Sequence, residues 1–430
     1  MKKITFLVKS IFVFCFLFGA ATMEAQVEFK LQTEMFTRFN DVNDNGQGVT
    51  TGQYYDFETN VLTNMEPEAT GLTSINNNGD VSGMMYLDEP NGIMQPAVKK
   101  NGTWTPIGYF PASNPEDSFF STYGISPNGK YVTGQMSIGC CDFGTFLYNT
   151  ETDELFEIMD PAGEAITGYT VTNDGIIGGW LDQPNGGGTL RVPAYFNKDG
   201  DVTLIPDGQL PVFSTNAISD INSSNVMVGD FDGQPFMYDQ TTDTFTIFTA
   251  PQGNAAAFSS ISDNGIAIGF EEVDFQIREA IIYHPDLGSE PVYLKDILED
   301  NGITVNTPDG KLGSAYKISD NGNYVAGWVN GPPMFAEGWM VYLDDLILET
   351  NEVSQNTVSF YPNPVENVLH LNSIEAIDSV AVYTITGQKV SNVTFNENRT
   401  ELNLSNLASG VYLVKVLSNG SVENLKVVKQ

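Results

Sequence analysis

A five-residue pattern that recurs seven times constrains the fold of this chain more than any other feature. Each copy opens with Val or Ile, continues with small polar residues and ends in Gly, or once in Asn. The copies are Val42–Gly46, Ile75–Gly79, Ile125–Gly129, Val171–Gly175, Ile221–Asn225, Ile261–Gly265 and Ile318–Gly322. Their first residues are 33, 50, 46, 50, 40 and 57 positions apart, spacings typical of repeat architectures.

Each copy predicts a tight hairpin. Asn-Gly and Asp-Gly pairs favour a type I′ turn, because that turn needs positive φ angles that these residues tolerate. Asn225 replaces Gly in the fifth copy, and Asn is the next residue best able to adopt a positive φ. A short apolar strand follows each turn and ends near a second glycine: Gly52, Gly83, Gly134, Gly179, Gly229, Gly269 and Gly327.

A second hairpin follows the first in most copies. The stretches 146–155 and 236–245 each show an aromatic strand, a polar turn and a returning strand. Two hairpins make four strands, and units of this length match propeller blades. We therefore predict an all-β protein with a seven-bladed β-propeller over residues 27–347, in which Val27–Leu31 closes the last blade. Six or eight blades and a β-solenoid remain alternatives.

The repeat core Ile-Ser-x-Asn-Gly-x-x-x-Gly also resembles the HAF-type extracellular repeat of secreted bacterial proteins. The resemblance covers residues 40–345. It implies an extracellular, propeller-like body and carries no settled activity.

The N-terminus has the features of an export signal. Lys2, Lys3 and Lys9 precede and flank an apolar run over residues 11–21, which is short for a membrane span. We predict a signal peptide over residues 1–25, cleaved after Ala25 or Ala21. No other stretch is apolar enough to cross a bilayer, so we expect no transmembrane segment in the mature form.

The C-terminus predicts a separate small domain. After a polar linker at 348–357, short alternating strands with turn residues between them fill 358–430 and indicate a small Ig-like β-sandwich. This segment resembles the type A C-terminal sorting domain of the type IX secretion system in Bacteroidetes. The residues that carry the resemblance include Tyr361, Pro362, Asn363, Pro364, Gly387, Gly410, Tyr412 and Lys429.

The resemblance implies that the type IX machinery is a partner of this protein. It also implies removal of the domain in the linker before Tyr361. The mature protein would then be released or attached to the outer-membrane surface.

Charge and histidine content restrict the chemistry of the chain. Acidic residues outnumber basic ones 54 to 19, giving a net charge of −35, and this charge repels nucleic acids. The chain has two histidines, His284 in a hairpin-turn position and His370 in the sorting segment. The sequence therefore offers no catalytic triad or histidine-rich zinc set. We expect no cofactor, with Ca²⁺ as the one alternative.

Cys140 and Cys141 are the cysteines that follow the signal peptide. They are adjacent, so they either form a vicinal disulfide or remain two loop thiols without a structural role.

The segments after the second glycines occupy one position in every repeat, so a propeller places them on one face. We predict an acidic binding face there for a glycan, a peptide or Ca²⁺, since loops on a rigid scaffold often carry binding sites. Its residues are Asp88, Asp142, Asp182, Asp232, Glu271 and Asp274. The favoured function is a secreted or surface-attached binding module. The alternatives are an extracellular glycoside hydrolase or polysaccharide lyase that uses carboxylates, and a structural component of the cell envelope.

Overall fold

The computed structural model describes most of the chain, in eleven segments. They are residues 28–33, 37–88, 93–108, 119–138, 142–185, 188–206, 216–331, 337–343, 358–384, 389–418 and 421–430. The chain divides into two compact units, Met1–Leu346 and Ile347–Gln430. The predicted signal peptide, the linker, Cys140, Cys141 and Gly387 lie outside the described residues.

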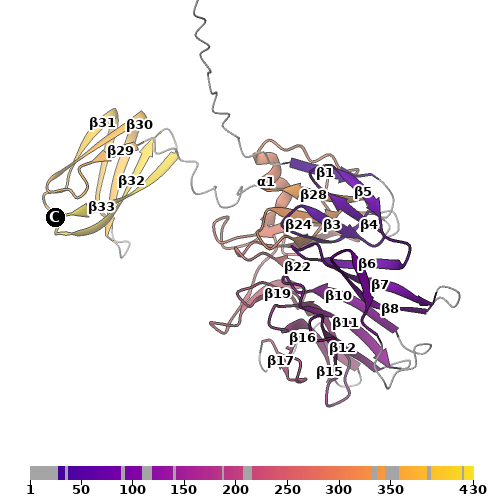
Figure 1. Ribbon diagram of the computed structural model, residues 1–430. Coiled ribbons are helices and arrows are strands. Elements are labelled where there is room, and N and C mark those ends of the chain that lie inside the picture. The colour runs from indigo at the N-terminus through magenta and orange to yellow at the C-terminus, as the bar shows by residue number, and fades with distance from the viewer. Residues whose placement is uncertain are drawn as a thin grey trace, which may run out of the picture. The chain divides into compact units, whose positions relative to one another are not determined.

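The first unit consists of seven four-stranded antiparallel sheets, which confirms the predicted blade number (Figure 1). Blade 1 contains β2 (Phe39–Val42), β3 (Gln47–Thr50), β4 (Gln53–Asp56) and β5 (Val61–Asn64). Blade 2 contains β6 (Ala69–Ile75), β7 (Val81–Asp88), β8 (Ile93–Lys100) and β9 (Thr103–Pro106). Blade 3 contains β10 (Phe119–Ile125), β11 (Tyr131–Ile138), β12 (Asp142–Asn149) and β13 (Glu154–Ile158).

The next three blades repeat this order. Blade 4 contains β14 (Ile166–Val171), β15 (Ile177–Asn185), β16 (Gly188–Phe196) and β17 (Val202–Leu204). Blade 5 contains β18 (Ala217–Ile221), β19 (Val226–Phe231), β20 (Gln234–Asp239) and β21 (Thr244–Ile247). Blade 6 contains β22 (Ala256–Ile261), β23 (Ala267–Asp274), β24 (Ile277–Tyr283) and β25 (Val292–Tyr293), followed by the helix α1 (Leu294–Asp300).

Blade 7 is built from both ends of the unit. It contains β26 (Ser314–Ile318), β27 (Tyr324–Trp328), β28 (Gly338–Tyr342) and, as its outer strand, β1 (Glu28–Gln32). Strand β1 pairs antiparallel with β28, with Phe29 opposite Val341 (Figure 1). The N-terminal strand therefore closes the ring, as predicted from Val27–Leu31.

The repeated hairpin uses a different turn from the one predicted. In all seven copies the fifth residue has a positive φ, between 60° at Asn225 and 89° at Gly265, whereas the fourth residue does not. Gly46 donates its N–H to the Asn43 carbonyl at 3.0 Å, and Asn43 donates to Gln47 at 2.9 Å. This is a type I turn followed by one left-handed residue, so the prediction of a type I′ turn is wrong.

The side chain in the second position explains the difference. The Asn43 Oδ1 atom accepts N–H groups from Asn45 and Gln47, both at 3.0 Å, and so holds the turn from inside. Asn76 and Asn222 make the same contacts in their copies. A type I′ turn does form at 101–102, where both residues have positive φ.

The core of the propeller lies between neighbouring blades. One cluster combines Leu147 of blade 3 with Ile166, Ile177 and Phe196 of blade 4, all buried. Another combines Phe39 of blade 1 with Ala326 and Met340 of blade 7. The apolar residues that alternate along the strands thus join each blade to the next. In the described part of the chain no helix is long and apolar enough to cross a membrane.

The second unit is a curled, five-stranded antiparallel sheet. Its strands are β29 (Val358–Tyr361), β30 (Val368–Thr384), β31 (Lys389–Asn403), β32 (Gly410–Ser418) and β33 (Ser421–Lys429). The first half of β30 pairs with β29, and its second half pairs with β32. Residues of both halves, such as Leu371 and Val382, are buried in one core. This small, all-β C-terminal domain agrees with the predicted fold class.

Candidate functional site

Each innermost strand of the propeller contains a bulge at the same repeat position. The pairing with the second strand slips by one residue, two positions before the Val or Ile that opens the turn. A bulge re-aims the side chain of the extra residue. The seven bulged residues are Asn40, Thr73, Tyr123, Tyr169, Ser219, Ser259 and Tyr316.

The second glycine of the repeat makes room for this bulge. A Cβ atom on Gly179 would lie 1.8 Å from the Thr167 carbonyl oxygen, and one on Gly134 would lie 1.9 Å from that of Ser121. In both blades the oxygen belongs to the residue two positions before the bulged one. Only glycine tolerates such a close backbone approach.

Blade 1 departs from this rule. Gly52 lies in the turn between β3 and β4, and a Cβ added to it would have nothing within 4 Å. Thr50 stands opposite Phe39, where the other blades have the glycine. β3 does end near Gly52, as predicted, but this glycine does not face the bulge as the second glycine of the other blades does.

The bulged residues line one pocket of about 550 Å³. All seven contribute to its wall, together with Trp180, Arg191, Asn216, Ala217, Asp230, Ala257, Phe258, Phe270 and Lys317. The pocket lies on the side of the channel where the second and third strands of each blade connect. It is the same side as the predicted acidic face, but its lining is aromatic and polar.

Aromatic rings and hydroxyl groups are both present in this lining. Tyr123 and Tyr169 meet edge to face at 5.7 Å, and the Trp180 Nε1 atom donates to the Tyr169 hydroxyl at 2.9 Å. Ser219 and Ser259 are half-buried, and no described residue forms a hydrogen bond with either hydroxyl. The pocket thus offers flat apolar faces beside unused hydrogen-bonding groups.

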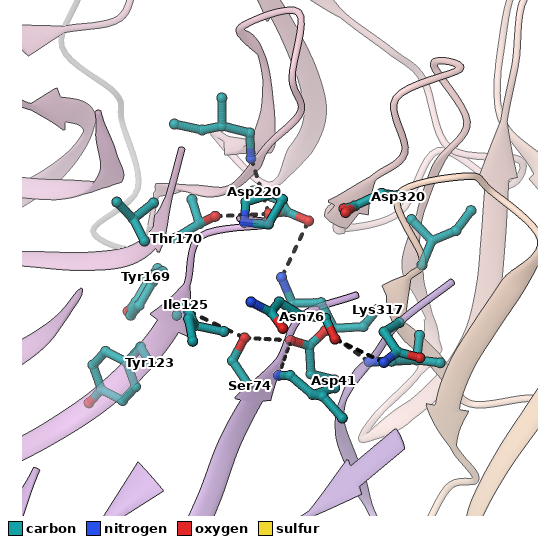
Figure 2. A pocket seen from close by; sticks show the side chains of 18 of the residues that line it. Asp41, Ser74, Asn76, Tyr123, Ile125, Tyr169, Thr170, Asp220, Lys317 and Asp320 are labelled. Carbon is teal, nitrogen blue, oxygen red and sulfur yellow. Dashed lines mark hydrogen bonds and ion pairs between the residues drawn. The ribbon is translucent and has the colours of Figure 1, made fainter. Parts of the chain in front are cut away.

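Lys317 forms the floor of the pocket, where it also borders a smaller cavity of about 70 Å³. Its Nζ atom lies 3.3 Å from Asp220 Oδ2 (Figure 2). Asp41 accepts a hydrogen bond from the Ser74 hydroxyl at 2.5 Å and one from the Ile75 N–H at 2.9 Å. Burial alone would lower the pKa of Lys317, but the carboxylates of Asp220 and Asp41 raise it above its usual value.

The far end of the channel is occupied by the repeat turns, which bond to one another. Asp44 N–H donates to Asn77 Oδ1 at 2.8 Å, and Asn321 N–H donates to Asp44 Oδ1 at 2.8 Å. Burial and the nearby carboxylates of Asp44 and Asp263 raise the pKa of Asp320 to about 7. Among the described residues, no group of three or more Cys, His, Asp or Glu side chains could hold a metal ion.

Asp230 supplies a carboxyl group within the larger pocket. It is the penultimate residue of β19 and is half-buried, and burial raises its pKa to about 7. It is the single carboxyl group among the described residues that line this pocket.

The six residues of the predicted acidic face lie at or near the connections between second and third strands. Asp182, Asp232, Glu271 and Asp274 are not among the residues that line the pocket. Asp88 ends β7, Asp142 begins β12 and Asp274 ends β23, with its carboxylate accepting the Phe275 N–H at 2.7 Å. The Asp182 Oδ1 atom lies 3.9 Å from the Arg191 Nε atom.

The other two residues of that set have local structural contacts. Glu271 is fully buried and accepts the Gln252 N–H at 3.0 Å and the Tyr293 hydroxyl at 2.7 Å. Asp232 occupies a hairpin turn with a φ of 54°.

The turn that carries the first part of the sorting motif contacts the last strand of the chain. The Asn363 Oδ1 atom accepts the Val428 N–H at 2.8 Å, so the turn at 362–364 is bonded to β33. Tyr361 stacks on His370 with a centroid distance of 5.1 Å. The Tyr412 hydroxyl donates to the Ala408 carbonyl at 2.9 Å, Gly410 begins β32, and Lys429 ends β33.

These features define a class of protein: a seven-bladed propeller followed by a small β-domain with a sorting motif. Residues 359–430 match the family model described as the secretion system C-terminal sorting domain. The chain therefore carries a type IX sorting domain, and the protein is secreted or attached to the cell surface.

Several solved structures are similar to the chain. One is PorZ, a surface component of the type IX secretion system of Porphyromonas gingivalis, at 14% identity and a TM-score of 0.43 over 89% of this chain and 56% of that one. Another is the extracellular domain of BT4673 from B. thetaiotaomicron, at 11% identity and a TM-score of 0.44 over 94% and 59%.

The propeller domain of the trilobed protease from Pyrococcus furiosus is also similar, at 9% identity and a TM-score of 0.44 over 73% and 91%. The chain spans less than two thirds of the PorZ and BT4673 chains. No curated protein matches the sequence.

Proposed function

We propose that this secreted protein is a binding module that captures a carbohydrate in the pocket of about 550 Å³. The single observation that supports this role is the convergence of all seven bulged residues on that pocket. The bulge interrupts regular strand pairing at the same position in every blade. In each case it directs one side chain toward the same pocket. A pocket of this size accommodates a small ligand.

The lining favours a sugar over an apolar ligand. Sugar rings have C–H faces that pack on aromatic rings, and their hydroxyl groups both donate and accept hydrogen bonds. Tyr123, Tyr169 and Trp180 supply the rings, and Ser219 and Ser259 supply hydroxyls that no described residue engages. Ca²⁺ at the acidic face stays a prediction, so binding should be measured with and without Ca²⁺.

The hydrolase alternative finds no support in the site or the comparisons. Glycoside hydrolysis needs two carboxyl groups on either side of one bond. In the described lining of the pocket, Asp230 has no second carboxyl group to act with it. Below the floor, Asp220 forms an ion pair with Lys317 and accepts a hydrogen bond from the Thr170 hydroxyl, and Asp41 accepts one from the Ser74 hydroxyl. These two carboxylates are therefore engaged in structural contacts.

A glycan array probed with the full chain tests the proposal. We expect selective binding that falls at least tenfold in a Tyr123→Ala variant, a loss of about 1.4 kcal/mol. Tyr86→Ala is the matched control, since Tyr86 is 37% exposed on β7 and outside the pocket. Absence of any glycan ligand, or equal losses in both variants, would contradict the proposal.

A further inference from the structure

All three arginines of the propeller lie over aromatic rings near the carbohydrate pocket. The chain has four arginines, and the fourth, Arg399, is in the sorting domain. The guanidinium carbon lies 3.5 Å from the centroid of the ring for Arg38 on Trp328, 4.0 Å for Arg191 on Trp180 and 3.7 Å for Arg278 on Phe270. Trp180 and Phe270 line the pocket, and the Trp328 ring packs at a tilt against Tyr316, which also lines it, with ring centroids 4.7 Å apart.

The repeat also places Arg38 next to the pocket, although Arg38 is not among the residues that line it. Arg38 precedes the bulged residue Asn40 by two positions, as Ala217 precedes Ser219 and Ala257 precedes Ser259. Ala217 and Ala257 both line the pocket. In blade 1 the chain thus has an arginine where two other blades have a methyl group.

Arg38 differs from the other two arginines in its partners. Arg191 lies 3.9 Å from Asp182, and Arg278 lies 3.1 Å from Glu272. Among the described residues, no carboxylate pairs with Arg38 and no acceptor takes a hydrogen bond from it. It is half-buried, and burial lowers its pKa from the usual value, although arginine stays charged at neutral pH.

No described carboxylate pairs with Arg38, although carboxylates are abundant in a chain with a net charge of −35. Its ring contacts involve the flat face of the guanidinium, and no described residue accepts a hydrogen bond from its N–H edge. A guanidinium edge matches the two oxygens of a carboxylate in a bidentate pair, which is among the stronger polar contacts in proteins.

We propose that the carbohydrate bound in this pocket is an acidic sugar whose carboxylate pairs with Arg38. This inference rests on the proposed function and specifies its ligand class. The sugar ring packs on the Tyr316 side of the pocket, and its carboxylate pairs with the Arg38 guanidinium, which has no described carboxylate partner. The remaining hydroxyl groups of the sugar face Ser259 and its neighbours.

The test compares one sugar in two charge states. Oligogalacturonate and its methyl ester are titrated into the full chain by calorimetry, with a sulfated neutral oligosaccharide as a third arm. We expect the acid to bind at least tenfold more tightly than the ester, and the sulfated sugar to bind no better than the ester. An equal affinity for acid and ester overturns the inference, and so does preference for the sulfated sugar.

Three variants assign the effect to the arginine. Arg38→Gln should abolish the difference in affinity between acid and ester. Arg38→Lys should keep part of this difference, because lysine retains the positive charge but lacks the planar, bidentate N–H donors of a guanidinium. Arg399→Gln is the control and should change nothing. Unchanged discrimination in Arg38→Gln, with an unchanged melting temperature, would overturn the inference. If neither galacturonate form binds while a neutral glycan does, the acidic class is wrong and the proposed function stands. If no glycan binds, the proposed function fails too.

Discussion

The two ends of the propeller channel are built from the same seven strands and differ in how their polar groups are used. At the turn end, side chains and N–H groups of neighbouring repeats bond to one another, as between Asp44 and Asn77. At the bulge end, no described residue forms a hydrogen bond with the Ser219 or Ser259 hydroxyl, and no described carboxylate pairs with Arg38. The first end holds the ring together, and the second end is open to a ligand. Each prediction below separates these two roles.

The largest effect is expected at the floor that divides the two ends. Lys317→Met removes the cation between Asp41 and Asp220, both largely buried, and should destabilise the propeller by about 3 kcal/mol or more. The measurement is urea unfolding of the full chain. Adding Asp41→Asn and Asp220→Asn should restore most of the loss, because the neutral set leaves no unpaired charge. A triple variant no more stable than the single one would argue against this arrangement.

A methyl group at the second glycine should damage the bulge end. Gly179→Ala places a Cβ against the Thr167 carbonyl and should cost about 1–3 kcal/mol, in the range of overpacked cores. It should also weaken glycan binding, because Tyr169 is the bulged residue of that blade. Gly52→Ala is the matched control, since nothing lies within 4 Å of its Cβ position. Similar unfolding midpoints for the two variants would show that the glycine is not needed for the bulge.

A change at the turn end should affect stability alone. Asp44→Ala removes the acceptor of the Asn321 N–H and the Asn77 amide, and should cost about 1 kcal/mol. Thermal unfolding measures this loss, and the affinity for the glycan should stay within twofold of the original. A coupled loss of binding would mean that the two ends do not act independently.

The smallest effect concerns pH. Burial raises the pKa of Asp230 to about 7, so this carboxyl is neutral below pH 7 and negative above it. An acidic sugar should therefore bind about threefold more weakly at pH 8 than at pH 6, as Coulomb repulsion across several ångströms of water predicts. Asp230→Asn should flatten this profile, measured by calorimetry at both pH values.

Asp320 at the turn end provides the control for that experiment, because its pKa is also raised to about 7. Asp320→Asn should leave the pH profile of binding unchanged. Both carboxyls hold their protons more tightly when folded, so each makes the protein less stable as pH rises from about 4 to 7. Either substitution should therefore reduce that dependence. A binding profile that responds to Asp320→Asn would contradict the separation of the two ends.

The sequence by itself determined the secretion tag and the all-β repeat body, and it favoured the blade number and the closing strand that the structure confirms. These follow from local patterns. Turn residues recur at blade-sized intervals, one predicted strand at the N-terminus precedes the first repeat, and residues 361–364 carry the sorting motif. The sequence also contains a feature that could have predicted the bulge. The second glycine marks the place where a carbonyl oxygen of the innermost strand comes close to the backbone of the second strand.

The tertiary structure alone decided where the site is. The bulged positions are Asn, Thr, Tyr or Ser, so no single residue type marks them in the sequence. Arg38, Trp328 and Tyr316 meet because the ring closes between blades 7 and 1, which brings together residues nearly 300 positions apart. A radial fold places one residue of every repeat at a common centre, and the chemistry of that centre exists only once all seven blades are assembled.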